Sequence, residues 1–313
     1  MKLLFSFIIT GFLLLTNFNS IAAWNEPCTS NNGVYVVPHS AAGYTDNNCQ
    51  IEPDLYAVTI YELGLCTAYP SPPTSTSAFD SSSVCTPVFT NSTGAFTVIV
   101  KNISTVLAGT IVRPPNGNYP YAYARIGTDF VLRSNFELSS PSNAYDIDTQ
   151  SGEDNTAGAV GKYCATKTAT VPNEGHSHLD GIDSTICGST PPTAGLLTQV
   201  LRDFNGATNG LATAWPTSGT SISGTDDYWI SDAAGYSQAY LEKENGLLPT
   251  AHAQVQYIVS TQKFTTPVVI TENSSSIDMK FNVAEGMDID LDDTRDNDLN
   301  ARLGPFSILM TVQ

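Results

Sequence analysis

Two segments near the C-terminus alternate strictly between apolar and polar residues. Their apolar positions are Ile277, Met279, Phe281 and Val283 in the first segment, and Met287, Ile289 and Leu291 in the second. A period of two predicts a strand with one buried face. The two apolar faces coincide if the strands form a hairpin, with Ala284-Glu285-Gly286 as its loop and Gly286 in a left-handed conformation. The sequence therefore predicts a hairpin over residues 277–291.

Residues 24–138 carry short runs of β-branched and aromatic residues, separated by turns rich in Pro, Ser, Asn and Gly. This texture favours a β-sandwich over βαβ units. The predicted strands lie near 34–37, 55–65, 95–100, 105–113, 119–126 and 130–138. The run 55–65 is apolar at both alternating sets of positions, which predicts a central strand buried on both faces.

Residues 139–250 break this pattern with many glycines, threonines and acidic turns. Two segments in this region, 194–204 and 233–244, have a polar start and end at a glycine, which predicts two short helices. We expect the region to be a long, partly helical insertion or a small subdomain. Residues 251–313 return to strands that complete the sandwich, so the predicted fold class is all-β, built as an antiparallel β-sandwich.

The N-terminus has the order of a secretory signal peptide: Lys2, an apolar run over 3–15, and small residues before Trp24. We expect residues 1–23 to be removed by cleavage after Ala23. The alternative is an uncleaved anchor, which needs roughly 20 apolar residues, whereas Thr16-Asn17 interrupt this run. No other run is long enough to cross a membrane. The mature chain is therefore expected to lack a transmembrane segment and to work in an extracellular, cell-surface or periplasmic space.

Charge narrows the range of partners. The chain has 13 Lys plus Arg against 30 Asp plus Glu, a net charge of -17. Such a surface repels nucleic-acid phosphates and anionic lipid headgroups, so neither is an expected partner. Cations and cationic surfaces are electrostatically favoured.

All six cysteines follow the predicted cleavage site. They are Cys28, Cys49, Cys66, Cys85, Cys164 and Cys187. An even number in an exported chain favours disulfides over metal binding or catalysis. Pairing each cysteine with its sequence neighbour gives three loops of similar size, although six cysteines allow 15 connectivities.

A calcium site is the first candidate for chemistry. In the predicted hairpin Asp278 lies opposite Asp292, and Asp290 shares their outward face. Like charges directly opposite each other repel. Calcium takes 6 to 8 oxygen ligands and would convert this repulsion into ligation. The alternative is a solvated acidic face, and the sequence requires no cofactor.

A second candidate is the segment His176-Ser177-His178-Leu179-Asp180-Gly181. It resembles the first zinc motif of the metallo-β-lactamase superfamily, His-x-His-x-Asp-His. The resemblance implies zinc ligands at His176, His178 and Asp180, but Gly181 stands where the motif has its final histidine, so a second zinc would lose a ligand. The match covers six residues, and its surroundings lack the preceding strand that the motif needs. The alternative is a polar disulfide loop that contains two histidines.

Aromatic residues gather in the middle region and are candidates for stacking on sugars, with a core role as the alternative. They are Trp215, Tyr228, Trp229, Tyr236 and Tyr240. The sequence has no Gly-x-Ser-x-Gly, P-loop or Rossmann motif, which gives an enzyme little support.

Three functions remain open. The first is an exported structural or adhesive protein of the cell surface, which assembles with copies of itself when the segment 24–38 pairs with a sheet edge of a neighbour. The second is a calcium-dependent carbohydrate-binding module. The third is a secreted hydrolase that uses zinc or paired carboxylates.

Overall fold

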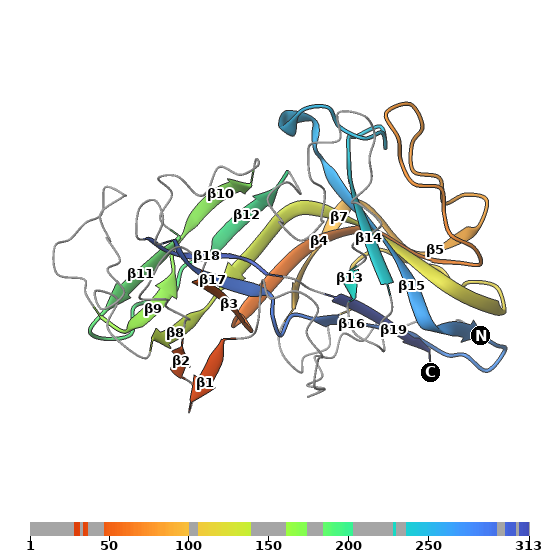
Figure 1. The fold of residues 1–313 in the computed structure, drawn as a ribbon. Coiled ribbons are helices and arrows are strands. Elements are labelled where there is room, and N and C mark those ends of the chain that lie inside the picture. The colour runs from red at the N-terminus through yellow and green to blue at the C-terminus, as the bar shows by residue number, and fades with distance from the viewer. Residues whose placement is uncertain are drawn as a thin grey trace.

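The protein is nearly all β-structure, as the sequence predicted (Figure 1). The computed structural model describes residues 28–31, 34–36, 47–99, 106–138, 161–173, 184–202, 228–229, 236–292, 298–304 and 307–312. Within these ranges the only helical segment is the short 3-10 helix η2 (His252–Gln254).

A nine-stranded sheet forms the centre of the molecule. Its main path runs through β13 (Tyr228–Trp229), β14 (Tyr236–Glu242), β15 (Tyr257–Ile270), β7 (Gly117–Arg133), β4 (Leu55–Cys66), β5 (Cys85–Ile99) and β6 (Thr110–Ile111). A branch adds β12 (Leu197–Leu201), which pairs with β7, and β10 (Ala169–Asn173), which pairs with β12.

Three smaller sheets complete the body. One has the order β1 (Thr29–Asn31), β2 (Val34–Val36), β8 (Asn135–Leu138), β9 (Tyr163–Thr166) and β11 (Thr185–Gly188). The second pairs β16 (Ile277–Asn282) with β19 (Ser307–Val312). The third has the order β18 (Asp298–Leu303), β17 (Met287–Asp292) and β3 (Asn47–Ile51).

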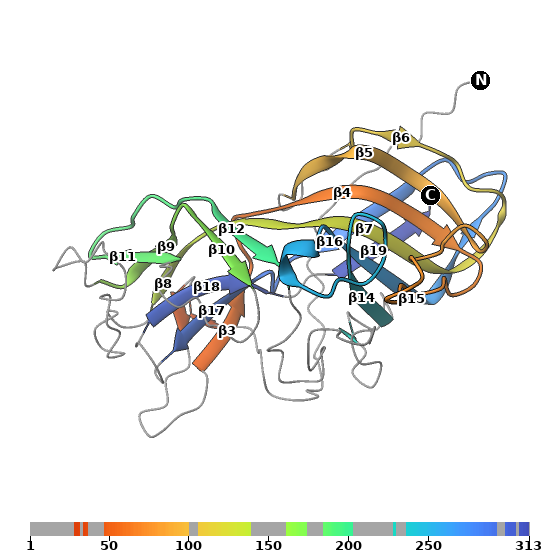
Figure 2. The same cartoon turned by 90° about the horizontal axis from the view of Figure 1, so that it is seen from above.

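Strands β4 and β7 run through both ends of the molecule (Figures 1 and 2). Along one edge, β7 pairs with β15 between Gly117 and Gly127 and then with β12 between Asp129 and Leu132. Along its other edge, β7 pairs with the whole of β4 between Tyr121 and Arg133. The two groups of strands visible in Figure 1 are therefore built on one shared strand pair.

The predicted central strand 55–65 is confirmed as β4, which lies between β5 and β7. Its residues Tyr56, Val58, Ile60, Leu63 and Leu65 are fully buried in the hydrophobic core. β4 has a neighbouring strand on each edge, and both of its faces are covered. A strand in this position needs apolar residues at nearly every place, which explains its almost continuous apolar run.

Both predicted helices are wrong. The segment 194–204 contains β12, which pairs with β7 and β10, and the segment 233–244 contains β14, which pairs with β15 over its whole length. A short apolar run cannot be assigned to helix or strand from its own pattern, and here distant pairing partners decide. Residues of the middle region thus belong to the central sheet.

The predicted hairpin over 277–291 is also wrong, although both strands exist. Strand β16 pairs with β19, and β17 pairs with β18 and β3. The residues between them form a turn in which the Gly286 N–H donates to the Val283 carbonyl, and Gly286 is not among the described glycines with positive φ. Alternation fixes which face of a strand is buried but not which strand lies beside it.

The three predicted disulfides are confirmed: Cys28–Cys49, Cys66–Cys85 and Cys164–Cys187. The second and third join residues directly opposite each other on neighbouring strands, β4 with β5 and β9 with β11. Each bridge restricts the unfolded chain and contributes about 2 to 4 kcal/mol.

Candidate functional site

A β-bulge in β4 places two neighbouring side chains on the same face of the central sheet. In the pairing with β7, Ile60 lies opposite Ile126 and Glu62 lies opposite Arg125, so Tyr61 is an extra residue on β4. The core residues of β4 change from even to odd numbers at this point. Tyr61 and Glu62 therefore both lie on the outer face, the face that points away from the main core.

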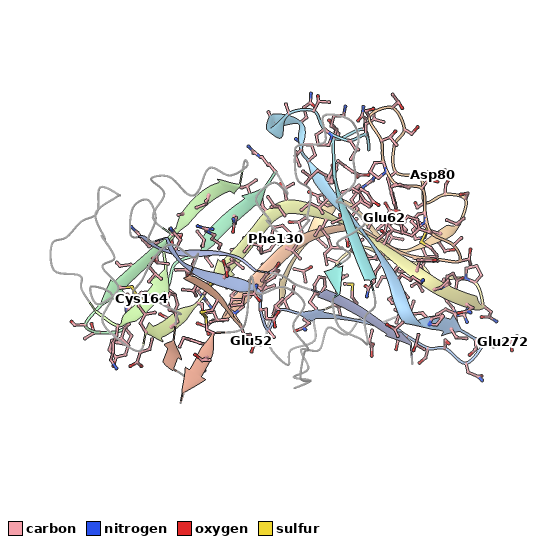
Figure 3. All side chains as sticks on the ribbon, in the orientation of Figure 1. Glu52, Glu62, Asp80, Phe130, Cys164 and Glu272 are labelled. Carbon is pink, nitrogen blue, oxygen red and sulfur yellow. A yellow bond between two sulfur atoms is a disulfide. The ribbon has the colours of Figure 1, made fainter. Side chains whose placement is uncertain are left out.

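The outer face brings charged side chains from three strands together, and Figure 3 labels one of them, Glu62. Arg125 on β7 lies opposite Glu62 in the register, and β15 lies between β7 and β14, which carries Glu242. We call Glu62, Tyr123, Arg125, Glu242 and Tyr257 the Arg125 cluster.

Arg125 holds both glutamates. Its Nε donates to Glu242 Oε2 at 2.9 Å and its Nη2 to Glu242 Oε1 at 3.3 Å, a two-point contact. Its Nη1 lies 3.9 Å from Glu62 Oε2. The guanidinium carbon is 5.7 Å from the ring centre of Tyr257, a cation–π contact. This planar, forked geometry is a property of arginine that lysine lacks.

Burial gives the cluster an unusual proton affinity. The Glu242 side chain is 0% exposed, whereas Arg125 is 28% and Glu62 25% exposed. Loss of hydration raises the pKa of Glu242 from 4.5 to about 7, although Arg125 opposes this shift. The Tyr123 hydroxyl donates to Glu62 Oε1 at 2.5 Å, and burial together with this bond raises the pKa of Tyr123 well above its ordinary value.

A loop closed by the second disulfide covers this face. We call residues 67–84, between Cys66 and Cys85, the strap. The Tyr69 hydroxyl lies 2.9 Å from the Tyr240 hydroxyl and 3.1 Å from Thr261 Oγ1. The ring of Phe79 packs on Tyr123 at 5.4 Å between centres. Figure 3 labels Asp80 on the strap and Glu62 on the sheet.

Local hydrogen bonds shape the strap before it meets the sheet. Thr74 Oγ1 accepts from the N–H groups of Thr76 and Ser77, and Asp80 Oδ1 accepts from the N–H and hydroxyl of Ser82. Short polar side chains that bond to nearby backbone favour turns. Prolines at 70, 72 and 73 further limit the conformations of the chain.

The turn after β14 completes the cover. The Gly246 N–H donates to the Lys243 carbonyl at 2.9 Å, and Gly246 has a φ of 78°. A Cβ at this position would lie 3.0 Å from Ala78 Cβ of the strap and 3.9 Å from Arg125 Nη2. Two features therefore favour glycine at position 246: the left-handed backbone conformation and the close approach of the strap.

The cluster can hold a proton near neutral pH, and it combines two carboxylates with one cation. Glu242 is enclosed on all sides, so it acts on its surroundings through Arg125 rather than by direct contact with a solute. Glu62 and Arg125 are the members that solvent reaches.

The predicted calcium residues lie elsewhere, and their pairing is wrong. Asp278 opposes Thr311 in the β16–β19 sheet, while Asp292 opposes Asp298 and Asp290 lies between Asn48 and Asn300. Within the described part of the chain, no group of three or more His, Cys, Asp or Glu residues is arranged to hold a metal ion. Calcium binding stays a prediction, without the Asp278–Asp292 contact that motivated it.

The predicted zinc residues His176, His178 and Asp180 lie outside the described residues, as does Trp215. Of the aromatic candidates, Tyr240 is buried and bonded to Tyr69, which is a structural role. Tyr228 and Trp229 form β13, and Tyr236 begins β14.

Sequence reasoning missed the Arg125 cluster. Glu62 is the single charge of the predicted strand 55–65, and Arg125 is the single charge of the predicted strand 119–126. A lone charge in a buried strand needs a partner. That signal was present in the sequence. Glu242 could not be recognised as their partner, because the segment that carries it was predicted to be a helix.

The fold and the cluster define an all-β protein with three disulfides and a covered ionic network. Within the described ranges, none of the helices has the length and apolar character needed to cross a bilayer. Comparison with protein-family models, curated proteins and solved structures found no match for this chain.

Proposed function

We propose that this protein is an exported structural or adhesive component of the cell surface. Three disulfides are compatible with an oxidising space outside the cytoplasm. The signal-peptide pattern of residues 1–23 and the net charge of -17 support export and solubility.

The continuity of β4 and β7 through both ends of the body carries this proposal. A protein that transmits load between two contacts benefits from a frame without a flexible joint, and a shared pair of long strands supplies one. The enclosed Arg125 cluster stiffens the same sheet, since its members come from β4, β7, β14 and β15.

Electron microscopy tests the proposal directly. Antibody-gold labelling of the cells that make the protein is expected to mark their outer surface, and trypsin added to intact cells is expected to remove the label. Label that stays in the cytoplasm, or protein recovered entirely in the medium, would contradict a surface role.

Self-assembly belongs to the same proposal and centres on the β1–β2 hairpin. Within the ranges that the structure describes, this hairpin meets its own β8 through two residue pairs, Val34 with Glu137 and Tyr35 with Leu138. So few backbone bonds are easily exchanged for the β8 edge of a second copy. The Cys28–Cys49 disulfide links the hairpin to β3. During the exchange, the hairpin would therefore reach the second copy as a closed loop and not as a free N-terminal arm.

Removal of residues 24–38, combined with Cys49→Ser to avoid a free thiol, is expected to abolish assembly and leave a folded monomer. The matched control is C28S/C49S, which lacks the disulfide but keeps the hairpin and is expected to assemble. Light scattering and negative-stain images report the size of both variants. Normal assembly of the deletion variant would refute hairpin exchange while leaving the surface role standing.

A further inference from the structure

A second, polar core lies between the strap and the outer face of the central sheet. Tyr123, Tyr240 and Val259 are buried outside the main hydrophobic core, and the polar residues Glu242 and Thr261 are buried as well. They come from β7, β14 and β15, and the strap packs on the same face through Tyr69 and Phe79. The strap therefore covers part of the face on which the Glu242 carboxylate is buried.

Few bonds hold the strap in place. Two backbone hydrogen bonds join it to the turn after β14: the Phe79 N–H donates to the Gly246 carbonyl at 3.2 Å, and the Leu248 N–H donates to the Thr74 carbonyl at 3.0 Å. Most of the strap is exposed apart from Pro70 and Pro73. A segment with few buried contacts and a covalent link at each end is suited to open locally while the sheet stays folded.

We propose that the strap is a pH-controlled cover, which closes over the Arg125 cluster when Glu242 is protonated and opens more readily when Glu242 is ionised. The geometry that carries this is a chain of contacts. It runs from Phe79 of the strap to Tyr123, from Tyr123 to Glu62, and through Arg125 to Glu242. Opening admits water to the outer face and exposes its tyrosines and charged groups.

The groups around Glu242 set the direction of the response. β7 contributes Arg125 and Tyr123, β4 contributes Glu62, and β15 contributes Tyr257, which lies opposite Glu242 in the register. The strap itself carries Tyr69 and Asp80, and the Asp80 carboxylate is engaged by Ser82. No second cation among these neighbours offsets the burial of Glu242.

The direction in which pH shifts the opening equilibrium of the strap follows from the difference in the pKa of Glu242 between the two states. In the closed state the pKa of Glu242 is about 7, and hydration in the open state returns it toward 4.5. The closed state therefore binds the proton more tightly, and raising the pH favours opening. For a full return to 4.5, the opening equilibrium increases about 30-fold between pH 5.5 and pH 8.0.

Amide hydrogen exchange measures this equilibrium at the two bonds that join the strap to the body. After correction for intrinsic exchange, protection of the Phe79 and Leu248 amides is expected to fall about 30-fold from pH 5.5 to pH 8.0. On a logarithmic scale, protection should fall steadily between pH 5.5 and pH 7 and level off above pH 7, the pKa of Glu242 in the closed state, while amides in the middle of β4 stay constant. A flat profile, or a profile that has already levelled off at pH 5.5, would overturn the proposal without affecting the proposed surface role.

Three variants test separately whether Glu242 causes the pH dependence and whether Tyr69 holds the strap closed. Glu242→Gln is expected to abolish the pH dependence, and Asp80→Asn, the strap's own carboxylate, is expected to leave it intact. Tyr69→Phe removes the hydroxyl contacts with Tyr240 and Thr261, so it should lower protection at both pH values by the same factor. An unchanged pH dependence in Glu242→Gln would overturn the assignment. If that variant does not fold, the pH at which wild-type protection levels off decides alone.

Discussion

Arg125→Met is expected to lower the free energy of unfolding by about 3 to 5 kcal/mol at pH 8, because it leaves the carboxylate of Glu242 buried without a partner. Glu242 is 0% exposed, so water cannot take the place of the guanidinium. Methionine keeps much of the apolar stem of arginine, which limits the effect to the loss of charge and hydrogen bonds. Urea unfolding followed by tyrosine fluorescence gives the difference.

A second substitution tests whether the loss comes from the orphaned carboxylate. Adding Glu242→Leu to Arg125→Met is expected to recover most of the stability, since replacing both members of a buried ion pair by apolar residues is often neutral or stabilising. The matched control is Lys162→Met, which removes an ion pair with Glu137 whose lysine is 42% exposed. That change should stay below about 1 kcal/mol. A double variant no more stable than Arg125→Met would contradict the explanation.

The cost of Arg125→Met should also depend on pH. The pKa of Glu242 is about 7 in the folded protein, against an ordinary value of 4.5. Its contribution to stability is therefore fully present below pH 4.5 and is lost as pH rises through 7. At pH 5.5 Glu242 is already neutral, so removing Arg125 breaks its hydrogen bonds and its contacts with Glu62 and Tyr257 but leaves no ionised Glu242 without a partner. The loss at pH 5.5 is expected to be less than half of that at pH 8.

The comparison of pattern with structure shows what local sequence determines in this chain. The disulfides and the central strand β4 followed from spacing and composition, because neighbouring cysteines and a two-sided apolar run are local signals. Partners of strands are not local. β17 pairs with β3, which lies more than two hundred residues earlier in the sequence, and nothing in Met287–Asp292 predicts that partner.

The same limit applies to the candidate site. Glu62 and Arg125 meet because of a bulge at Tyr61, which shifts the register of β4 against β7 by one residue and which no local sequence pattern predicts. Glu242 joins them because β14 is added to β15, a long-range pairing that overrides the helix-like ends of its segment. The calcium prediction failed in its geometry for the same reason, since the proposed contact of Asp278 required a wrong neighbour.

Phe130→Ala is expected to destabilise the protein by about 3 to 5 kcal/mol, the usual cost of a large cavity in a packed core. Phe130 is 0% exposed and packs edge-on against Tyr56, with 6.1 Å between ring centres. It lies on β7, opposite Val58 of β4 and Gln199 of β12. The cavity therefore opens in the stretch of β7 that joins the two ends of the molecule.

Because β4 and β7 belong to both ends, Phe130→Ala should lower the unfolding midpoint of the whole body in one transition. Hydrogen exchange in β9 and β15, which lie in different sheets, should accelerate by the same factor. The matched control is Phe96→Ala: Phe96 is 61% exposed on β5, and its removal should change stability by about 0.5 kcal/mol or less. Two separate transitions, with β15 protected after β9 has unfolded, would show that the shared strands do not make the body one cooperative unit and would remove the mechanical argument for a structural role.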